Sequence, residues 1–180
     1  MMFLLDTDVL STFRKKQPHP AVLSWVAGIG WRDLITTVVT VAEVQRGIER
    51  SRPRHPQTAK ETEAWLDTML TVGEPQVLPM TIAATRLLGR MYETPALRNF
   101  VVFDSRARTQ ATGAELSIAA IAISVGGVVT TINVTHFLQV HAAFPLPGLF
   151  DPMHRRWHVQ SAALREASGN FPWRATAPQE

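Results

Sequence analysis

The chain alternates between short apolar runs and longer stretches in which apolar residues recur at helical spacing. Continuous apolar runs of about four to eight residues indicate buried strands, whereas recurrence every third or fourth residue indicates helices. The pattern predicts strands at residues 2–5, 34–39, 76–80 and 128–132, with a brief last strand at most within 145–152. It predicts helices at 9–16, 21–27, 40–50, 58–72, 81–92 and 115–124, and irregular structure at 93–112.

This order of elements, strand followed by helix, indicates an α/β fold with a parallel sheet covered on both faces. Right-handed crossovers then bring the carboxyl ends of the strands to one edge, which is where open α/β sheets place their sites. We expect one domain over residues 1–152 and a C-terminal tail over 153–180. The pattern leaves open whether this tail packs on the domain, reaches a partner or is disordered.

The composition fits one globular domain of 180 residues, 46% of them hydrophobic. The absence of cysteine excludes thiolate metal sites, a cysteine nucleophile and disulfides, and favours a cytoplasmic protein. Asp6 and Asp8 interrupt the N-terminal apolar run too early for a signal peptide. The apolar run at 118–129 is shorter than the roughly 18 residues of a membrane span, so we expect a soluble protein with no membrane partner.

The basic residues are 15 arginines and three lysines, and the net charge is +3. The planar guanidinium of arginine suits phosphate contacts, but a GC-rich genome produces the same bias without functional meaning. Arg46, Arg86 and Arg90 are candidates for phosphate contacts. Arg86 and Arg90 lie four residues apart on one side of a predicted helix, and the alternative for this pair is a solvated face.

A carboxylate follows the first predicted strand directly. Asp6 ends a buried apolar run, so it is partly desolvated and needs a cation or hydrogen-bond donors to offset that cost. Asp8 has a simpler structural explanation, because it can act as the N-cap of the helix that follows. Asp6 is therefore the stronger functional candidate.

Three further polar residues fall at strand ends or in first helical turns: Glu43, Glu115 and Asn133. Each acid has a structural alternative, since Glu43 fits a capping box with Thr40 and Glu115 complements a helix dipole. A shared functional site explains all of them together with Asp6. Three carboxylates in one cleft repel one another unless a cation intervenes, and an all-oxygen ligand set favours Mg²⁺ or Mn²⁺.

Four segments in order along the chain carry a family resemblance: residues 3–11 (FLLDTDVLS), 40–48 (TVAEVQRGI), 112–122 (TGAELSIAAIA) and 129–137 (VTTINVTHF). They resemble the successive motifs of PIN domains. More narrowly, they resemble VapC-type toxins and related plasmid-stability proteins of bacterial toxin–antitoxin operons. The motifs extend from residue 2 to about residue 152.

The resemblance implies a three-layer α/β/α sandwich on a five-stranded parallel sheet. It implies a Mg²⁺- or Mn²⁺-dependent endoribonuclease that cuts RNA, frequent homodimerisation, and an antitoxin protein that blocks the site. By position, the metal-binding acids would be Asp6, Glu43 and Glu115, with Asn133 as the fourth polar site and with Thr7 and Ser11 as supporting polar contacts. The arginines named above would then position the RNA backbone.

Two departures from the family pattern leave a second interpretation open. The third acid is normally aspartate, so Glu115 is one methylene longer, and Asn133 stands where aspartate is frequent. His136 occupies another frequent aspartate position, and we interpret it as a surface-loop residue. The alternative is a catalytically weakened PIN-like domain that binds RNA or an antitoxin.

A phosphatase of the haloacid-dehalogenase type also begins with a hydrophobic strand that runs into Asp-Thr-Asp. Such enzymes need a downstream lysine and a late pair of acids. Lys60 is the last lysine of this chain, and no two acids are adjacent after Asp104. The sequence therefore favours the nuclease over the phosphatase.

Overall fold

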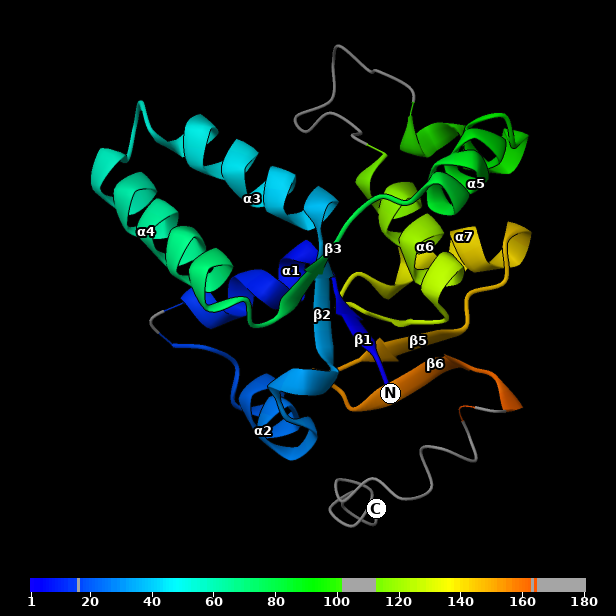
Figure 1. Ribbon diagram of the computed structural model, residues 1–180, viewed down its shortest axis with the longest axis horizontal. Helices are drawn as coiled ribbons and strands as arrows, with labels where there is room; N and C mark the ends of the chain where they lie inside the picture. Colours follow the sequence, from blue (N-terminus) through cyan, green and yellow to red (C-terminus); the bar gives the residue numbers. More distant parts are fainter. Residues whose placement is uncertain (16, 102–112, 163, 165–180) are drawn as a thin grey trace.

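The computed structural model describes residues 1–15, 17–101, 113–162 and 164 (Figure 1). These residues form one sheet with the strand order β3-β2-β1-β4-β5-β6. The strands are β1 (Phe3–Leu5), β2 (Leu34–Thr37), β3 (Gln76–Leu78), β4 (Val128–Thr130), β5 (Gly148–Asp151) and β6 (Arg156–Gln160). The first five are mutually parallel, which confirms the predicted α/β class and parallel sheet.

The sheet has a sixth strand that the sequence pattern did not predict. β6 runs antiparallel to β5 and lies inside the segment 153–180, which we expected to be a tail. The placement of Arg156–Gln160 is therefore that of an edge strand, one of the possibilities left open for this segment. Residues 163 and 165–180 of the expected tail, and residues 102–112 of the expected irregular stretch, lie outside the described residues.

Helices cover both faces of the sheet (Figure 1). The α-helices are α1 (Thr7–Leu10), α2 (Pro20–Ile29), α3 (Val38–Ser51), α4 (Pro56–Val72), α5 (Ile82–Tyr92), α6 (Ala114–Val125) and α7 (Val134–Ala143). The 3₁₀ helices are η1 (Ser11–Arg14), η2 (Trp31–Asp33) and η3 (Pro95–Phe100). Helix α7 was not predicted. No helix among the described residues has both the length and the hydrophobicity needed to cross a membrane.

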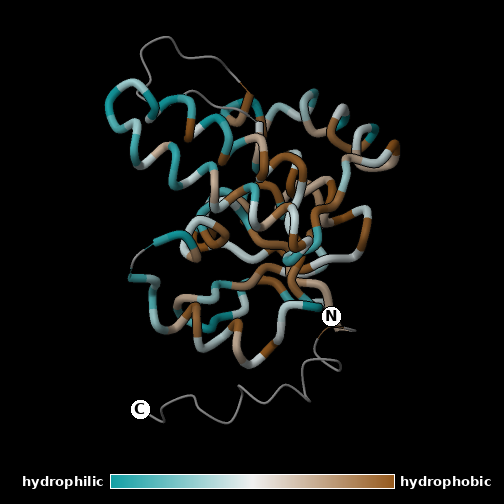
Figure 2. Tube along the Cα trace, turned by 60° about the vertical axis from the view of Figure 1, so that its left-hand side comes forward, coloured by the Kyte–Doolittle hydropathy of each residue, from teal (hydrophilic) through white to brown (hydrophobic). Residues whose placement is uncertain are grey.

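Two hydrophobic clusters, one on each face, make the fold a three-layer sandwich. Phe3 and Leu5 of β1 belong to the cluster under α1 to α4, whereas Leu4 belongs to the cluster under α5 to α7. Successive strand residues point to opposite faces, so a strand buried on both sides must be apolar at every position. Figure 2 shows this distribution, with hydrophobic residues concentrated inside the fold and hydrophilic residues on the outer helices.

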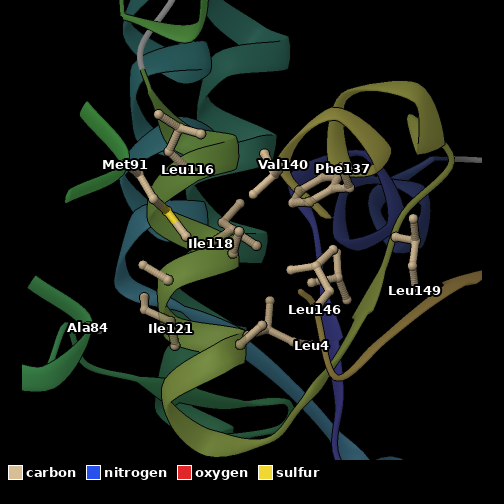
Figure 3. Packing of buried hydrophobic residues seen from close by; sticks show 14 of the residues in the cluster. Leu4, Ala84, Met91, Leu116, Ile118, Ile121, Phe137, Val140, Leu146 and Leu149 are labelled. Carbon is tan, nitrogen blue, oxygen red and sulfur yellow. The ribbon is translucent and has the colours of Figure 1, made fainter. Parts of the chain in front are cut away.

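Helix α6 is the centre of one layer. Its residues from Leu116 to Ala122 are all buried, as its small and apolar composition predicts. Figure 3 shows its side chains beside Phe137 and Val140 of α7 and above Leu4 of β1. This packing fixes the start of α6, and therefore Glu115, relative to the end of β1.

The register of the strands determines which residues meet at the carboxyl edge. Leu5 of β1 pairs with Thr130 of β4, and Thr37 of β2 pairs with Leu78 of β3. The residues that follow these positions in β1 and β4 are Asp6 and Thr131. The parallel sheet thus places the polar residues that end β1 and β4 side by side.

Candidate active site at the carboxyl edge of the sheet

Asp6 is held by the chain that leaves β1. Its backbone is extended (φ −70°, ψ 162°), and its side chain caps α1. One carboxylate oxygen, Oδ1, accepts from the Thr7 backbone N–H at 2.7 Å, and Oδ2 accepts from the Thr131 hydroxyl at 2.8 Å. The predicted N-cap role of Asp8 is therefore wrong. Only Asp6 separates β1 from α1, and Asp8, which is exposed, already lies inside that helix.

Burial dominates the electrostatics of Asp6, whose exposed fraction is only 7%. Desolvation raises the pKa of the Asp6 carboxyl from 3.8 to about 7, although the hydrogen bonds from Thr131 and Thr7 oppose the shift. The nearby charges of Asp8 and Glu43 raise this pKa further. A cation beside Asp6 would therefore stabilise the ionised form that the protein alone disfavours.

Glu43 reaches the site from α3. The N-cap of this helix is Thr37, whose hydroxyl oxygen accepts from the Thr40 N–H at 3.1 Å. The capping box of Thr40 and Glu43 is therefore wrong, because the helix starts earlier and Glu43 lies in its second turn. The Glu43 side chain instead accepts a short hydrogen bond from the Thr7 hydroxyl.

The charge of Glu43 is also disfavoured where it lies. Burial is the largest cause of the raised pKa of Glu43, and the Thr7 hydrogen bond opposes it. The charge of Glu115 raises this pKa as well, and that of Arg46 lowers it. The carboxylates of three separate segments therefore influence one another, as expected for a shared site.

Glu115 lies in the first turn of α6 and faces the start of α7. Its Oε1 is 3.2 Å from Nδ1 of His136, and the same ring nitrogen is 3.0 Å from Nδ2 of Asn133. His136 lies in the first turn of α7, so its interpretation as a surface-loop residue is wrong. The helix that the sequence pattern missed turns this ring back towards the acids.

The hydrogen bonds form a continuous path through the site. The backbone N–H of Asn133 donates to the Thr131 hydroxyl oxygen at 2.9 Å, which in turn donates to Asp6. These hydrogen bonds join Glu43, Thr7, Asp6, Thr131 and Asn133 in that order. Nδ1 of His136 lies beside both Asn133 and Glu115, and its tautomer decides whether it accepts from the Asn133 amide or donates to the Glu115 carboxylate. The sequence reasoning named Thr7 but missed Thr131, whose only sequence signal is its place at the end of a β-branched strand.

The donor set fits a hard divalent cation by its chemistry, since it consists of carboxylate, hydroxyl and amide oxygens around charges that repel one another. Among the residues that the structure describes, however, no three His, Cys, Asp or Glu side chains are arranged to hold a metal ion as they stand. Hydrogen bonds to threonine and histidine occupy the acids instead. The residues therefore fit an ion in kind, and their side chains would have to turn to surround it.

The other candidates lie at different distances from the acids. Ser11 lines a groove together with Thr7 and Glu43. Arg46 is exposed on α3 and acts on Glu43 through its charge. Arg86 and Arg90 are exposed on α5, and the Arg90 guanidinium lies 6.0 Å from the ring centroid of Phe144, beyond the end of α7.

Comparisons with known proteins give the same fold. A chain of the structure described as DNA-bound VapBC from Salmonella typhimurium matches with a TM-score of 0.62 at 18% identity, over 84% of this chain and 98% of that one. A chain of FitAcB from Neisseria gonorrhoeae matches with a TM-score of 0.58 at 21% identity, over 85% and 99%. In sequence, ribonuclease VapC14 of Mycobacterium tuberculosis (strain CDC 1551 / Oshkosh) is 30% identical over 67 residues.

This chain resembles VapC-type proteins in sequence and has their fold. The resemblance that the four motifs indicate is thereby confirmed. The matched segment covers 37% of this chain and 65% of the length of VapC14. No protein-family model matches the chain.

Proposed function

We propose that this protein is a Mg²⁺- or Mn²⁺-dependent endoribonuclease and the toxin of a type II toxin–antitoxin system. The observation that carries the proposal is the set of polar contacts, made through two threonines and a histidine, that brings Asp6, Glu43, Glu115 and Asn133 to one edge of the sheet. The similarity to ribonuclease VapC14 supports RNA as the substrate class. A cytoplasmic location, expected from the cysteine-free sequence, suits such a substrate.

The ion would be held by Asp6 and Glu115, with Glu43 either binding it or orienting the attacking water. When bound, such an ion lowers the pKa of water and stabilises the charge that develops on phosphate. Two threonines position the acids by hydrogen bonds. The Thr131 hydroxyl and the Thr7 backbone N–H donate to the Asp6 carboxylate, and the Thr7 hydroxyl donates to Glu43. Asp6 must be ionised to bind the metal ion, so we expect the affinity of the site for the ion to rise with pH.

A cleavage assay with an acid-to-amide pair of variants tests the proposal. Wild-type protein is incubated with single-stranded and structured RNA in Mg²⁺, in Mn²⁺ and in EDTA. We expect cleavage only with a metal, loss of cleavage in Asp6→Asn, and wild-type cleavage in Asp67→Asn, whose carboxylate is exposed on α4. Cleavage that persists in Asp6→Asn at the wild-type rate contradicts the proposed mechanism.

The alternative is a catalytically weakened domain that binds RNA or an antitoxin. It is favoured by the engagement of Glu115 with His136 and by the lack of a preformed ion site among the described residues. Such a protein would retard RNA in a native gel and leave it intact in every metal tested. The same assay therefore separates the two functions.

An antitoxin and a second copy of the chain are the proposed protein partners. Solved structures that share the fold are described as VapBC and FitAcB, some of them bound to DNA. Copurification of an untagged protein encoded beside this chain, with loss of RNA cleavage in the complex, would support the antitoxin. Light scattering of the isolated chain tests the homodimer.

A further inference from the structure

A polar groove of about 300 Å³ begins at the acid site and follows α3 away from it. Thr7 and Glu43 line it, as does Ser51, which lies eight residues after Glu43 on the same helix. At about 1.5 Å per helical residue the groove extends roughly 12 Å along α3. Its other walls are η1 and the first half of α4.

Two arginines give this groove its charge. Arg14 reaches it from η1 and Arg50 from α3. The Arg14 Nη1 donates to the Thr62 hydroxyl oxygen of α4 at 3.2 Å, which holds that guanidinium across the groove. Thr62 donates to the Thr58 carbonyl oxygen at 2.7 Å, so its hydroxyl proton is used and its oxygen faces Arg14.

These two guanidiniums differ from that of Arg52 on the same stretch of chain. Arg52 is paired with Glu49 at 2.9 Å and with Glu63 at 3.0 Å. No ion pair joins Arg14 or Arg50 to any carboxylate among the residues placed by the structure, and the only described carboxylate in the groove lining is Glu43. The groove is therefore positively charged beyond its acidic end.

We propose that this groove binds the phosphodiester backbone of an RNA strand on one side of the cleaved bond, with Arg14 and Arg50 as phosphate contacts. Guanidinium groups and Ser or Thr hydroxyls are the side chains that commonly contact phosphate oxygens. No described aromatic side chain lines the groove, so it lacks a platform on which bases could stack. The contact is therefore independent of sequence and sets the position of the strand. This inference rests on the proposed function.

The experiment measures binding separately from cleavage. A fluorescently labelled single-stranded RNA of mixed sequence is titrated in EDTA at several salt concentrations, and anisotropy reports its affinity. Arg14→Gln and Arg50→Gln should each weaken RNA binding by about tenfold. This factor corresponds to the weakest hydrogen bonds that charged groups commonly make. Each should also reduce the slope of log affinity against log salt by about 0.7.

Two further variants keep the test decisive. Arg32→Gln is the matched control, because Arg32 is exposed in η2 at the amino end of β2, away from the acids, and should bind RNA as wild type does. Thr58→Glu adds a carboxylate to the α4 wall at an exposed position. It should weaken RNA binding by repelling phosphate, although both arginines are kept. If Arg14→Gln unfolds through loss of its Thr62 contact, Arg50→Gln and Thr58→Glu still test the groove.

The outcomes separate this inference from the proposed function. If wild type cuts RNA but Arg14→Gln, Arg50→Gln and Thr58→Glu bind RNA with wild-type affinity and salt slope, the groove proposal is overturned and the nuclease stands. If wild type does not cut RNA, the nuclease proposal fails whatever the groove binds. If the variants lose only a copurified protein partner and still bind RNA, the groove belongs to that partner and the inference is wrong.

Discussion

Replacing Asp6 by asparagine should stabilise the metal-free protein at high pH. Asparagine is as good an N-cap as aspartate, so the hydrogen bond from the Thr7 N–H can remain. The variant loses the burial cost of a negative charge, which is what raises the pKa of Asp6 from 3.8 to about 7. The substitution thus isolates the electrostatic cost of the site.

The sign of the stability change follows from the raised pKa of Asp6. Because the pKa of Asp6 is higher in the folded than in the unfolded state, its contribution to stability is fully present below about pH 4 and is lost as the pH rises through about 7. The difference between 3.8 and about 7 corresponds to about 4 kcal/mol, since one pKa unit corresponds to about 1.4 kcal/mol. At pH 5 less than half of this loss has occurred.

Asparagine also weakens one hydrogen bond, because the Thr131 hydroxyl donates to an oxygen that becomes an amide nitrogen in one orientation. That loss costs about 1 kcal/mol. In EDTA, Asp6→Asn should therefore be about 3 kcal/mol more stable than wild type at pH 8, and within about 1 kcal/mol of it at pH 5.

Urea unfolding followed by tryptophan fluorescence measures both values, since Trp25 is fully buried. The quantity compared is the difference between variant and wild type at each pH, because groups that do not interact with Asp6 titrate equally in both proteins and cancel. Asp67→Asn is the control, and its difference in unfolding free energy from wild type should be the same at pH 5 and pH 8. A difference between Asp6→Asn and wild type that is the same at pH 5 and pH 8 would refute the reasoning.

Added Mg²⁺ should nearly cancel the stability difference between Asp6→Asn and wild type if Asp6 is a ligand of the ion. An ion that binds only the folded state stabilises it by about 2.7 kcal/mol at a hundred times its dissociation constant. Wild type should gain this stability at pH 8 and Asp6→Asn should not. An equal gain in both proteins would remove Asp6 from the set of ligands.

Three further predictions address other parts of the molecule. Glu43→Gln should keep its contact with the Thr7 hydroxyl and lose RNA cleavage, and a wild-type rate would exclude Glu43 from the chemistry. His136→Ala should lower the cleavage rate and leave the free energy of unfolding nearly unchanged, because it removes the contacts that position Glu115 and Asn133. Cleavage kinetics and urea unfolding measure the two quantities. Leu4→Ala should lower the free energy of unfolding by about 3 kcal/mol, since Leu4 is fully buried under α6, and a loss below about 1 kcal/mol would contradict that packing.

The sheet and the meeting of acids at its edge followed from the sequence because both depend on strong local patterns. An unbroken apolar run ending at Asp6 predicts a strand buried on both faces, and parallel topology then places the ends of the strands together. The edge strand β6 was missed although Arg156–Gln160 alternate strictly between polar and apolar residues, because the signal is only five residues long and has only two apolar positions, Trp157 and Val159. Pairing with β5 identifies this short segment as a strand.

The contacts within the site could not be predicted for a different reason. Thr131 meets Asp6 across 125 residues of sequence, and no local pattern encodes that distance of 2.8 Å. The same holds for the caps: Asp6 and Thr37 cap their helices because their strands end where they do. A shift of two residues would have made Asp8 the cap of α1, and a shift of three would have made Thr40 the cap of α3.

Glu115 and His136 are best understood together. Glu115 stands where the resemblance described above implies an aspartate, so its side chain extends one methylene further from α6. Its Oε1 lies 3.2 Å from Nδ1 of His136 in the first turn of α7. This contact engages one oxygen of the carboxylate and leaves the other for the site. Asn133 lies against the same ring nitrogen and brings no further charge, which limits the repulsion that already raises the pKa of Glu43. The two departures from the family pattern therefore act together: Asn133 adds no charge to the site, and His136 contacts the longer acid that stands on α6.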